Sequence, residues 1–174
     1  LLDKEKCCGV AMIANGLTDG AKKHAEHNVD VLQKAVDKNL KVLTTSSTCV
    51  LTMRDEYRDL LKIDNSGVRD SLLLATKFIY GLIDSGKVKL AFKKDYKANI
   101  AYHTPCHLEK LGWGIFSVSL LKMIPGVKFT MLDSNCCGIS GTYGFKKENY
   151  EVSQAIGKPL FDQIGKVAPD FVAC

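Results

Sequence analysis

The chain alternates between segments with helical spacing of hydrophobic residues and short β-rich runs. Residues 18–37 place Ala21, Ala25, Val29 and Leu32 on one helical face. The same spacing predicts helices over residues 49–61, 67–83, 106–123 and 147–165. Strands are predicted at residues 40–45, 88–92, 100–103 and 129–132 and at the chain end. This alternation predicts an α/β fold with mostly parallel sheets.

An internal repeat surrounds two Cys-Cys-Gly tripeptides. Cys7-Cys8-Gly9 and Cys136-Cys137-Gly138 are each followed by a helical segment and then by a β-rich run. We therefore expect two related α/β halves, residues 1–86 and 87–174, joined within the lysine-rich stretch 85–97. Because parallel strands end at one edge of a sheet, we expect the cysteines of each half to gather at strand C-terminal ends.

Composition narrows the class of protein. The 174 residues are 46% hydrophobic and 25% charged, which is typical of a globular protein. No stretch approaches the roughly 20 apolar residues that span a bilayer. A net charge of +5 is too weak to argue for nucleic acid as a partner. The chain begins with Leu rather than Met, so we expect it to be part of a longer protein.

Lysines gather at five positions in the middle of the chain, Lys87, Lys89, Lys93, Lys94 and Lys97. A run of this kind is usually a solvated face. The alternative is a surface that attracts anionic lipid or an acidic partner.

Seven cysteines are the unusual feature of the composition. Their number is odd, and two adjacent pairs could form internal disulfides only with strain. Such spacing favours metal or redox chemistry. The candidate ligands are three cysteines in each half, Cys7, Cys8 and Cys49 in the first and Cys106, Cys136 and Cys137 in the second. A single buried cysteine usually packs as a small hydrophobic residue, and this explanation suffices for Cys174.

The residues next to the cysteines favour thiolate chemistry. Pro105 places Cys106 in a first helical turn, where the helix dipole lowers a thiol pKa. Gly9, Gly138 and Gly141 allow backbone N–H groups to approach the sulfur atoms. Adjacent thiolates point in different directions, which suits a multi-iron cluster better than one tetrahedral zinc ion.

Neither the histidines nor the glycine-rich segment adds a further candidate site. His103 and His107 flank Cys106 and are expected to be supporting or surface residues rather than ligands. His24 and His27 are expected to be solvated. The segment 138–144 matches neither the dinucleotide nor the phosphate-loop spacing, which argues against a nucleotide site.

Three strings of residues resemble the CCG cysteine-rich domain family, which includes the B subunit of heterodisulfide reductase and the iron–sulfur subunits of glycolate and lactate oxidation. The strings are residues 44–57, residues 103–110 and residues 132–149. The family pattern ends in Cys-x-x-Cys. Ser46 stands where its first cysteine would be, so we expect fewer thiolates in the first half. Cys174 falls short of the Cys49 position, so we do not expect it to be a ligand.

The resemblance implies an iron–sulfur electron-transfer subunit. Its cofactor would be a 4Fe-4S cluster, in cubane or non-cubane form. The resemblance further implies flavin-containing catalytic subunits as electron donors, menaquinone as acceptor and a peripheral position on the cytoplasmic face of a bacterial inner membrane. The leading cysteine of the first repeat and the last Cys-x-x-Cys would lie outside these residues. We therefore expect the 174-residue chain alone to hold a partial cluster or none.

Two alternatives stay open from the sequence. A heterodisulfide-reductase-like subunit would use clusters to cleave a disulfide substrate, and full ligand sets in both repeats would favour it. A structural zinc protein would have no redox function. Optical and EPR spectra distinguish both from electron transfer, because zinc is spectroscopically silent and iron–sulfur clusters are not.

Overall fold

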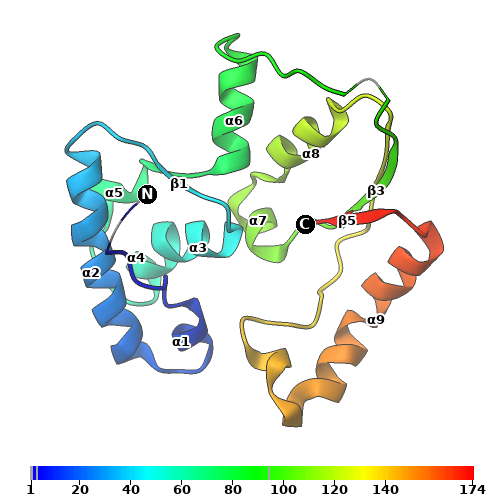
Figure 1. The fold of residues 1–174 in the computed structure, drawn as a ribbon. Helices are drawn as coiled ribbons and strands as arrows, with labels where there is room; N and C mark the ends of the chain where they lie inside the picture. The colour runs from blue at the N-terminus through cyan, green and yellow to red at the C-terminus, as the bar shows by residue number, and fades with distance from the viewer. Residues whose placement is uncertain (1, 3, 94) are drawn as a thin grey trace. The chain divides into compact units, whose positions relative to one another are not determined.

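The computed structural model describes residue 2, residues 4–93 and residues 95–174. The chain forms two compact units, Leu1–Ala75 and Thr76–Cys174, and each combines helices with parallel strands (Figure 1). The predicted α/β class and the parallel pairing are confirmed. The units are divided at Ala75 and Thr76, whereas the repeat boundary at residues 86 and 87 stays a prediction.

The first unit packs its helices around a two-stranded sheet. Its elements are α1 (Val10–Ala14), α2 (Thr18–Val36), β1 (Val42–Thr44), α3 (Ser47–Leu51), the π-helix η1 (Thr52–Glu56), α4 (Tyr57–Asp59), α5 (Ser66–Arg69) and β2 (Leu72–Leu74). Strands β1 and β2 are parallel. Ala21 and Ala25 of α2 pack against Tyr57 and Leu61 in one apolar core, and all four are almost fully buried. Small side chains on α2 therefore let the helical segment 47–59 approach closely.

The second unit contains a three-stranded parallel sheet in the order β4-β3-β5. Its elements are α6 (Ala75–Asp84, whose first residue belongs to the first unit), β3 (Ala98–Tyr102), α7 (Cys106–Leu111), α8 (Gly114–Lys122), β4 (Val127–Met131), the 3-10 turns η2 (Tyr143–Phe145) and η3 (Lys147–Asn149), α9 (Tyr150–Val167) and β5 (Phe171–Ala173). Leu160 of α9 packs against Ala101 of β3 and Leu132. This contact anchors α9 to the sheet beside the second Cys-Cys-Gly segment.

Three predicted elements are wrong in part. The helix over residues 67–83 is interrupted by β2, because Leu72–Leu74 pairs with β1 and tertiary pairing overrides the helical preference of leucine. The helix over 106–123 ends at Gly112, whose left-handed φ of 69° caps α7 before α8 begins. The strand predicted over 88–92 is absent from that described segment, which makes no sheet pairing there.

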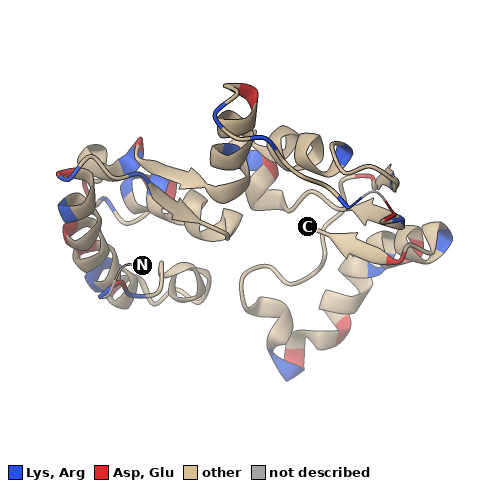
Figure 2. Cartoon of the chain, turned by 45° about the horizontal axis from the view of Figure 1, so that its top comes forward, with Lys and Arg blue, Asp and Glu red and all other residues tan. Residues whose placement is uncertain are grey.

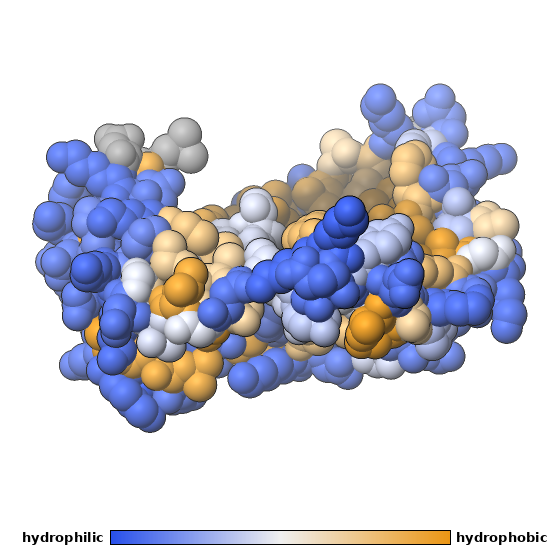
Figure 3. Space-filling model, turned by 90° about the horizontal axis from the view of Figure 1, so that it is seen from below, coloured by the Kyte–Doolittle hydropathy of each residue, from blue (hydrophilic) through white to orange (hydrophobic). Residues whose placement is uncertain are grey.

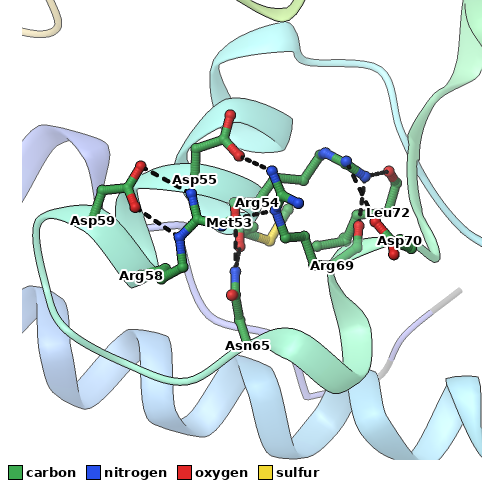
Figure 4. A network of polar contacts seen from close by, with 9 residues as sticks. All are labelled: Met53, Arg54, Asp55, Arg58, Asp59, Asn65, Arg69, Asp70 and Leu72. Carbon is green, nitrogen blue, oxygen red and sulfur yellow. Dashed lines mark hydrogen bonds and ion pairs between the residues drawn. The ribbon is translucent and has the colours of Figure 1, made fainter.

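A polar network fixes the π-helix that follows Cys49 (Figure 4). The Asn65 side chain donates to the carbonyl oxygens of Met53 at 2.6 Å and Arg54 at 2.9 Å. Arg69 donates to the same Arg54 carbonyl at 3.2 Å and forms an ion pair with Asp55 at 2.9 Å. A π-helix leaves backbone groups without their usual helical partners, so these side chains stabilise its turn.

Both units carry charged residues and exposed hydrophobic residues on their surfaces. Lysine and arginine positions are spread along the helices and loops (Figure 2). The face in Figure 3 shows hydrophobic residues in separate places among hydrophilic ones. Lys87, Lys89, Lys93 and Lys97 are exposed, while Lys94 lies outside the described residues. Among the helices that the structure describes, none has both the length and the apolar character to cross a membrane.

Candidate metal centre

The first Cys-Cys-Gly segment is attached to α2 through its backbone. The Asn28 side-chain oxygen accepts the Lys6 N–H at 2.7 Å. The Asn28 amide group donates to the carbonyl oxygens of Lys6 at 3.1 Å and Cys7 at 3.4 Å. Gly9 follows with φ of 92°, a left-handed conformation that strains any other L residue, and α1 begins directly after it. The backbone of Cys7 and Cys8 is thus held by Asn28 of α2 on one side and by the turn at Gly9 on the other.

Cys49 approaches this segment from the first turn of a different helix. Ser46 caps α3, and its hydroxyl oxygen accepts the Cys49 N–H at 3.3 Å. Interaction with the neighbouring Cys8 thiol lowers the pKa of Cys49 to about 6, and Ser46 lowers it further. The same interaction and burial raise the pKa of Cys8 well above its usual value. The two thiols therefore affect each other's ionisation.

The three cysteines of the first half line one cavity of about 690 Å³. Cys8 is buried, Cys49 is half-buried and Cys7 is exposed. The apolar part of the cavity wall includes Leu32, Val42 and Met53. An apolar wall lowers the local dielectric, so it strengthens electrostatic interactions at the sulfur atoms. The predicted convergence of Cys7, Cys8 and Cys49 is therefore found in the first unit.

The donor set fits a multi-iron cluster better than a single ion. Within the described stretches, no three His, Cys, Asp or Glu side chains lie close enough to hold one metal ion. A cluster accepts thiolates on different iron atoms, so its ligands stand further apart around a larger volume. Three thiols around one cavity meet this requirement better than they meet the compact tetrahedral geometry of zinc.

The cysteines of the second half follow the ends of adjacent strands. Cys106 is the first residue of α7, just after β3, and Cys136 and Cys137 follow β4. Because β3 and β4 are parallel neighbours, the segments that follow them leave from the same edge of the sheet. All three are exposed. Cys174 directly follows β5 and is exposed as well, so its explanation as a buried hydrophobic residue is wrong.

The second Cys-Cys-Gly segment is tied to α9. The Gly138 N–H donates to the Cys136 sulfur at 3.4 Å, and the Ser153 hydroxyl donates to the Gly138 carbonyl at 2.9 Å. Gly138 has φ of 85°, and a side-chain carbon placed on it would lie 2.1 Å from the Ser153 carbonyl oxygen. Gly157 likewise meets the Cys137 carbonyl, where a side-chain carbon would lie 2.9 Å away. Close backbone contact with α9 therefore requires glycine at these positions. Gly141 also has a positive φ, of 67°, and its expected role in bringing backbone N–H groups to the sulfurs stays a prediction.

Histidines support both cysteine segments. The buried His103 ring donates from Nε2 to the Asn135 carbonyl at 2.8 Å, just before Cys136. His24 donates to the Cys7 carbonyl at 3.2 Å and His27 to the Lys4 carbonyl at 2.6 Å. His24 and His27 are half-buried rather than fully solvated, and both hold the N-terminal segment against α2. The supporting role expected of His103 agrees with its position.

Sequence reasoning missed Asn28 and Ser153. Both lie on buried helical faces: α2 buries Ala21, Ala25, Asn28 and Leu32, and α9 buries Ser153, Gly157 and Leu160. The signal was present, because a polar residue at a core position of an amphipathic helix needs a hydrogen-bond partner. Its partner, a backbone segment of the cysteine loop, could be found only from the fold.

A family model described as a cysteine-rich CCG domain matches residues 1–54 and 100–174. The chain belongs to the CCG cysteine-rich domain family. Each matched region contains one Cys-Cys-Gly tripeptide, as the internal repeat predicts. The two CCG regions differ in the structure: the cysteines of the first line a cavity, and those of the second lie on the surface.

Several curated relatives resemble this CCG protein. Over 99% of the chain, it is 53% identical to the C subunit of the anaerobic glycerol-3-phosphate dehydrogenase of Escherichia coli K12, and it spans 43% of that protein. It is 27% identical over 87% of the chain to an uncharacterized iron–sulfur protein of Methanocaldococcus jannaschii, and spans 28% of it. It is 29% identical over 83% of the chain to lactate utilization protein A of Bacillus pumilus, and spans 60% of it. The chain thus covers less than two thirds of each relative.

Proposed function

We propose that this chain belongs to an iron–sulfur electron-transfer subunit of an anaerobic glycerol-3-phosphate dehydrogenase. In this proposal the subunit passes electrons from flavin-containing catalytic subunits towards menaquinone. The 53% identity to the C subunit of that enzyme supports the assignment. The observation that carries it is the placement of Cys7, Cys8 and Cys49 around one cavity, although they come from a loop and a separate helix.

The proposed ligands are Cys7, Cys8 and Cys49 in the first unit and Cys106, Cys136 and Cys137 in the second. When bound, an iron–sulfur cluster supplies one-electron redox chemistry. The chain contributes thiolates, of which Cys49 is ionised near neutral pH, and N–H donors such as that of Gly138 to the Cys136 sulfur. Such donors stabilise negative charge on sulfur and so favour the reduced state.

Ser46 supports electron transfer over disulfide cleavage. Its hydroxyl caps α3 and accepts the Cys49 N–H, so this position has a structural role in the helix. A hydroxyl is a poor iron ligand compared with a thiolate. The first site therefore lacks one thiolate of the family pattern, which disfavours the heterodisulfide-reductase-like alternative.

The proposal includes a peripheral membrane position on the cytoplasmic face. The exposed lysines between residues 87 and 97 are the candidate contact surface. Trp113 and Phe116 are less suitable, because the Lys77 ammonium lies 4.0 Å from the Trp113 ring centroid and Tyr80 pairs with Phe116 at 5.5 Å. Both aromatic residues thus pack against α6 within the second unit.

The proposal is tested on the full-length protein purified without oxygen. Iron, sulfide and zinc are measured, EPR spectra are recorded before and after reduction, and glycerol-3-phosphate is then added with the flavoprotein subunits. The expected result is iron with matching sulfide and an EPR signal that appears when glycerol-3-phosphate is added. Zinc without sulfide would support a structural metal protein, and reduction by a thiol substrate alone would support disulfide chemistry.

A further inference from the structure

Strand β1 is paired along one edge only. Among the residues that the structure describes, its sheet has two strands, and β2 is the single partner of β1. The Val42 N–H donates to the Ser71 carbonyl at 2.9 Å. Because the backbone groups of successive residues in a parallel strand point to opposite neighbours, the N–H and C=O of Leu43 point away from β2. They form a free sheet edge, which can pair with a further strand.

The cysteine cavity runs along this free edge. The consecutive residues 40–45 all line it. Successive side chains of a strand point to opposite faces of the sheet, so a cavity that contacts every one of these residues lies beside the backbone edge rather than over one face. Leu32 and Ala35 of α2 line the same cavity. Its volume of about 690 Å³ is therefore a space beside an unpaired strand, with apolar side chains in its wall.

The helices determine on which side of β1 an earlier strand belongs. Leu32 of α2 and Val68 of α5 pack in one apolar core with Val42 of β1. Helix α2 leads into β1, and α5 lies on the connection from β1 to β2, so both connections cover the same face of the sheet. Parallel crossovers are right-handed in roughly 98% of cases, and two such crossovers on one face move across the sheet in the same direction. A strand that leads into α2 therefore lies on the side of β1 opposite β2.

The second unit shows such an earlier strand in place. Helix α9 leads into β5 as α2 leads into β1, and each helix follows a Cys-Cys-Gly tripeptide. Strand β5 pairs in parallel with the earlier strand β3, with Val172 opposite Ala101. Strand β3 ends at Tyr102, well before Cys136, whereas Cys7 is only the seventh residue of this sequence. The counterpart of β3 in the first repeat is therefore not among these 174 residues.

We propose that a further strand of the full-length protein pairs in parallel with the free edge of β1 and closes the cavity beside the first three cysteines. A source in the same polypeptide is supported by the Escherichia coli relative, of which this chain spans 43%. The strand is apolar, because Leu40 and Leu43 are exposed at the edge and Leu32 and Ala35 line the cavity. Its backbone bonds to Leu43, as in strand addition to an open sheet. The inference goes beyond electron transfer, since it concerns how the first site is enclosed.

Hydrogen exchange of the full-length protein, resolved to single residues, tests the pairing. The Val42 N–H is bonded to β2 and provides the internal reference. With a strand at the free edge, the Leu43 amide should exchange within about tenfold of the Val42 rate, because both are held in a ladder. Without one, it should exchange on the order of a thousandfold faster than Val42, like an exposed loop. The faster result would overturn the inference.

A photo-crosslinker identifies the occupant. Leu40→p-benzoylphenylalanine places the reactive group at the free edge, and Leu60→p-benzoylphenylalanine is the matched control, because Leu60 follows α4 and the two leucines are 54% and 56% exposed. The expected product joins position 40 to a peptide of the same polypeptide outside residues 1–174, and the control lacks it. A product with another subunit, with a second copy or only within residues 1–174 would overturn the assignment. Neither measurement requires a bound cluster, so this inference and the proposed function can fail separately.

Discussion

Cys8 and Cys49 line the same cavity, although Cys8 lies in a loop at the start of the first unit and Cys49 lies in a helix after β1. Their interaction lowers the pKa of Cys49 and raises that of Cys8. Ligation of metal by both as thiolates requires Cys8, whose pKa is raised, to lose its proton. Metal binding at the first site should therefore depend on pH and release a proton.

Cysteine-to-serine substitutions should distinguish the proposed ligands from Cys174. Cys8→Ser, Cys49→Ser, Cys136→Ser and Cys137→Ser should each lower the iron content of the full-length protein, because each removes a proposed thiolate ligand. Cys174→Ser should leave iron unchanged, since Cys174 does not reach the Cys49 position in the repeat. Iron and sulfide per chain are the measurements. Equal loss in Cys174→Ser would contradict the distinction.

The reactivity of Cys49 should follow its lowered pKa. In reduced, iron-free protein, alkylation of Cys49 by iodoacetamide should reach half its maximal rate near pH 6 and fall below that pH, because only the thiolate reacts. Ser46→Ala removes a hydrogen bond to Cys49 and should move this midpoint to higher pH. Mass spectrometry of the Cys49 peptide gives the rate. The unfolded protein in urea is the control, and a midpoint equal to its value would refute the prediction.

Gly138→Ala should be strongly destabilising. It places a side chain at a left-handed φ and 2.1 Å from the Ser153 carbonyl oxygen, so both strain and a backbone clash result. We expect a loss of about 3 kcal/mol in the free energy of unfolding. Gly112→Ala is the matched control, because Gly112 has a φ of 69° with no atom within 4 Å of the added carbon. Strain alone should cost about 1 kcal/mol there. Urea unfolding compares the two, and equal losses would show that the contact with Ser153 is unimportant.

The π-helix after Cys49 should depend on Asn65. Asn65→Ala leaves the carbonyl oxygens of Met53 and Arg54 without this donor in a buried place, and should lower the free energy of unfolding by about 2 kcal/mol. Arg58→Ala removes only an exposed ion pair with Asp59 and should change stability little. Hydrogen exchange of residues 52–56 would locate the effect. Unchanged exchange in Asn65→Ala would argue against the network.

Membrane binding, if electrostatic, should weaken with salt. Lysine-to-glutamine changes at Lys87, Lys89, Lys93 and Lys97 should reduce flotation of the full-length protein with anionic liposomes at low ionic strength. Neutral liposomes serve as the control. Retention that is independent of both salt and these lysines would exclude this surface.

The sequence by itself determined the α/β class, the repeat and the candidate ligands. Helical spacing gave α2 and α9 almost to their ends, because each buries one regular apolar face. The two Cys-Cys-Gly tripeptides identified the family without any structure. These features are local, so neighbouring residues contain the necessary information.

Only the tertiary structure decided how the sites are built. Strand β2 exists because Leu72–Leu74 meets β1, and a leucine run alone does not distinguish strand from helix. The cavity brings Cys7 and Cys8 together with Cys49, and Asn28, which also lines it, is hydrogen-bonded to Tyr57 from a different helix. Gly138 must be glycine because Ser153 lies against it. Each of these depends on contacts between residues distant in the chain, which periodicity and spacing do not contain.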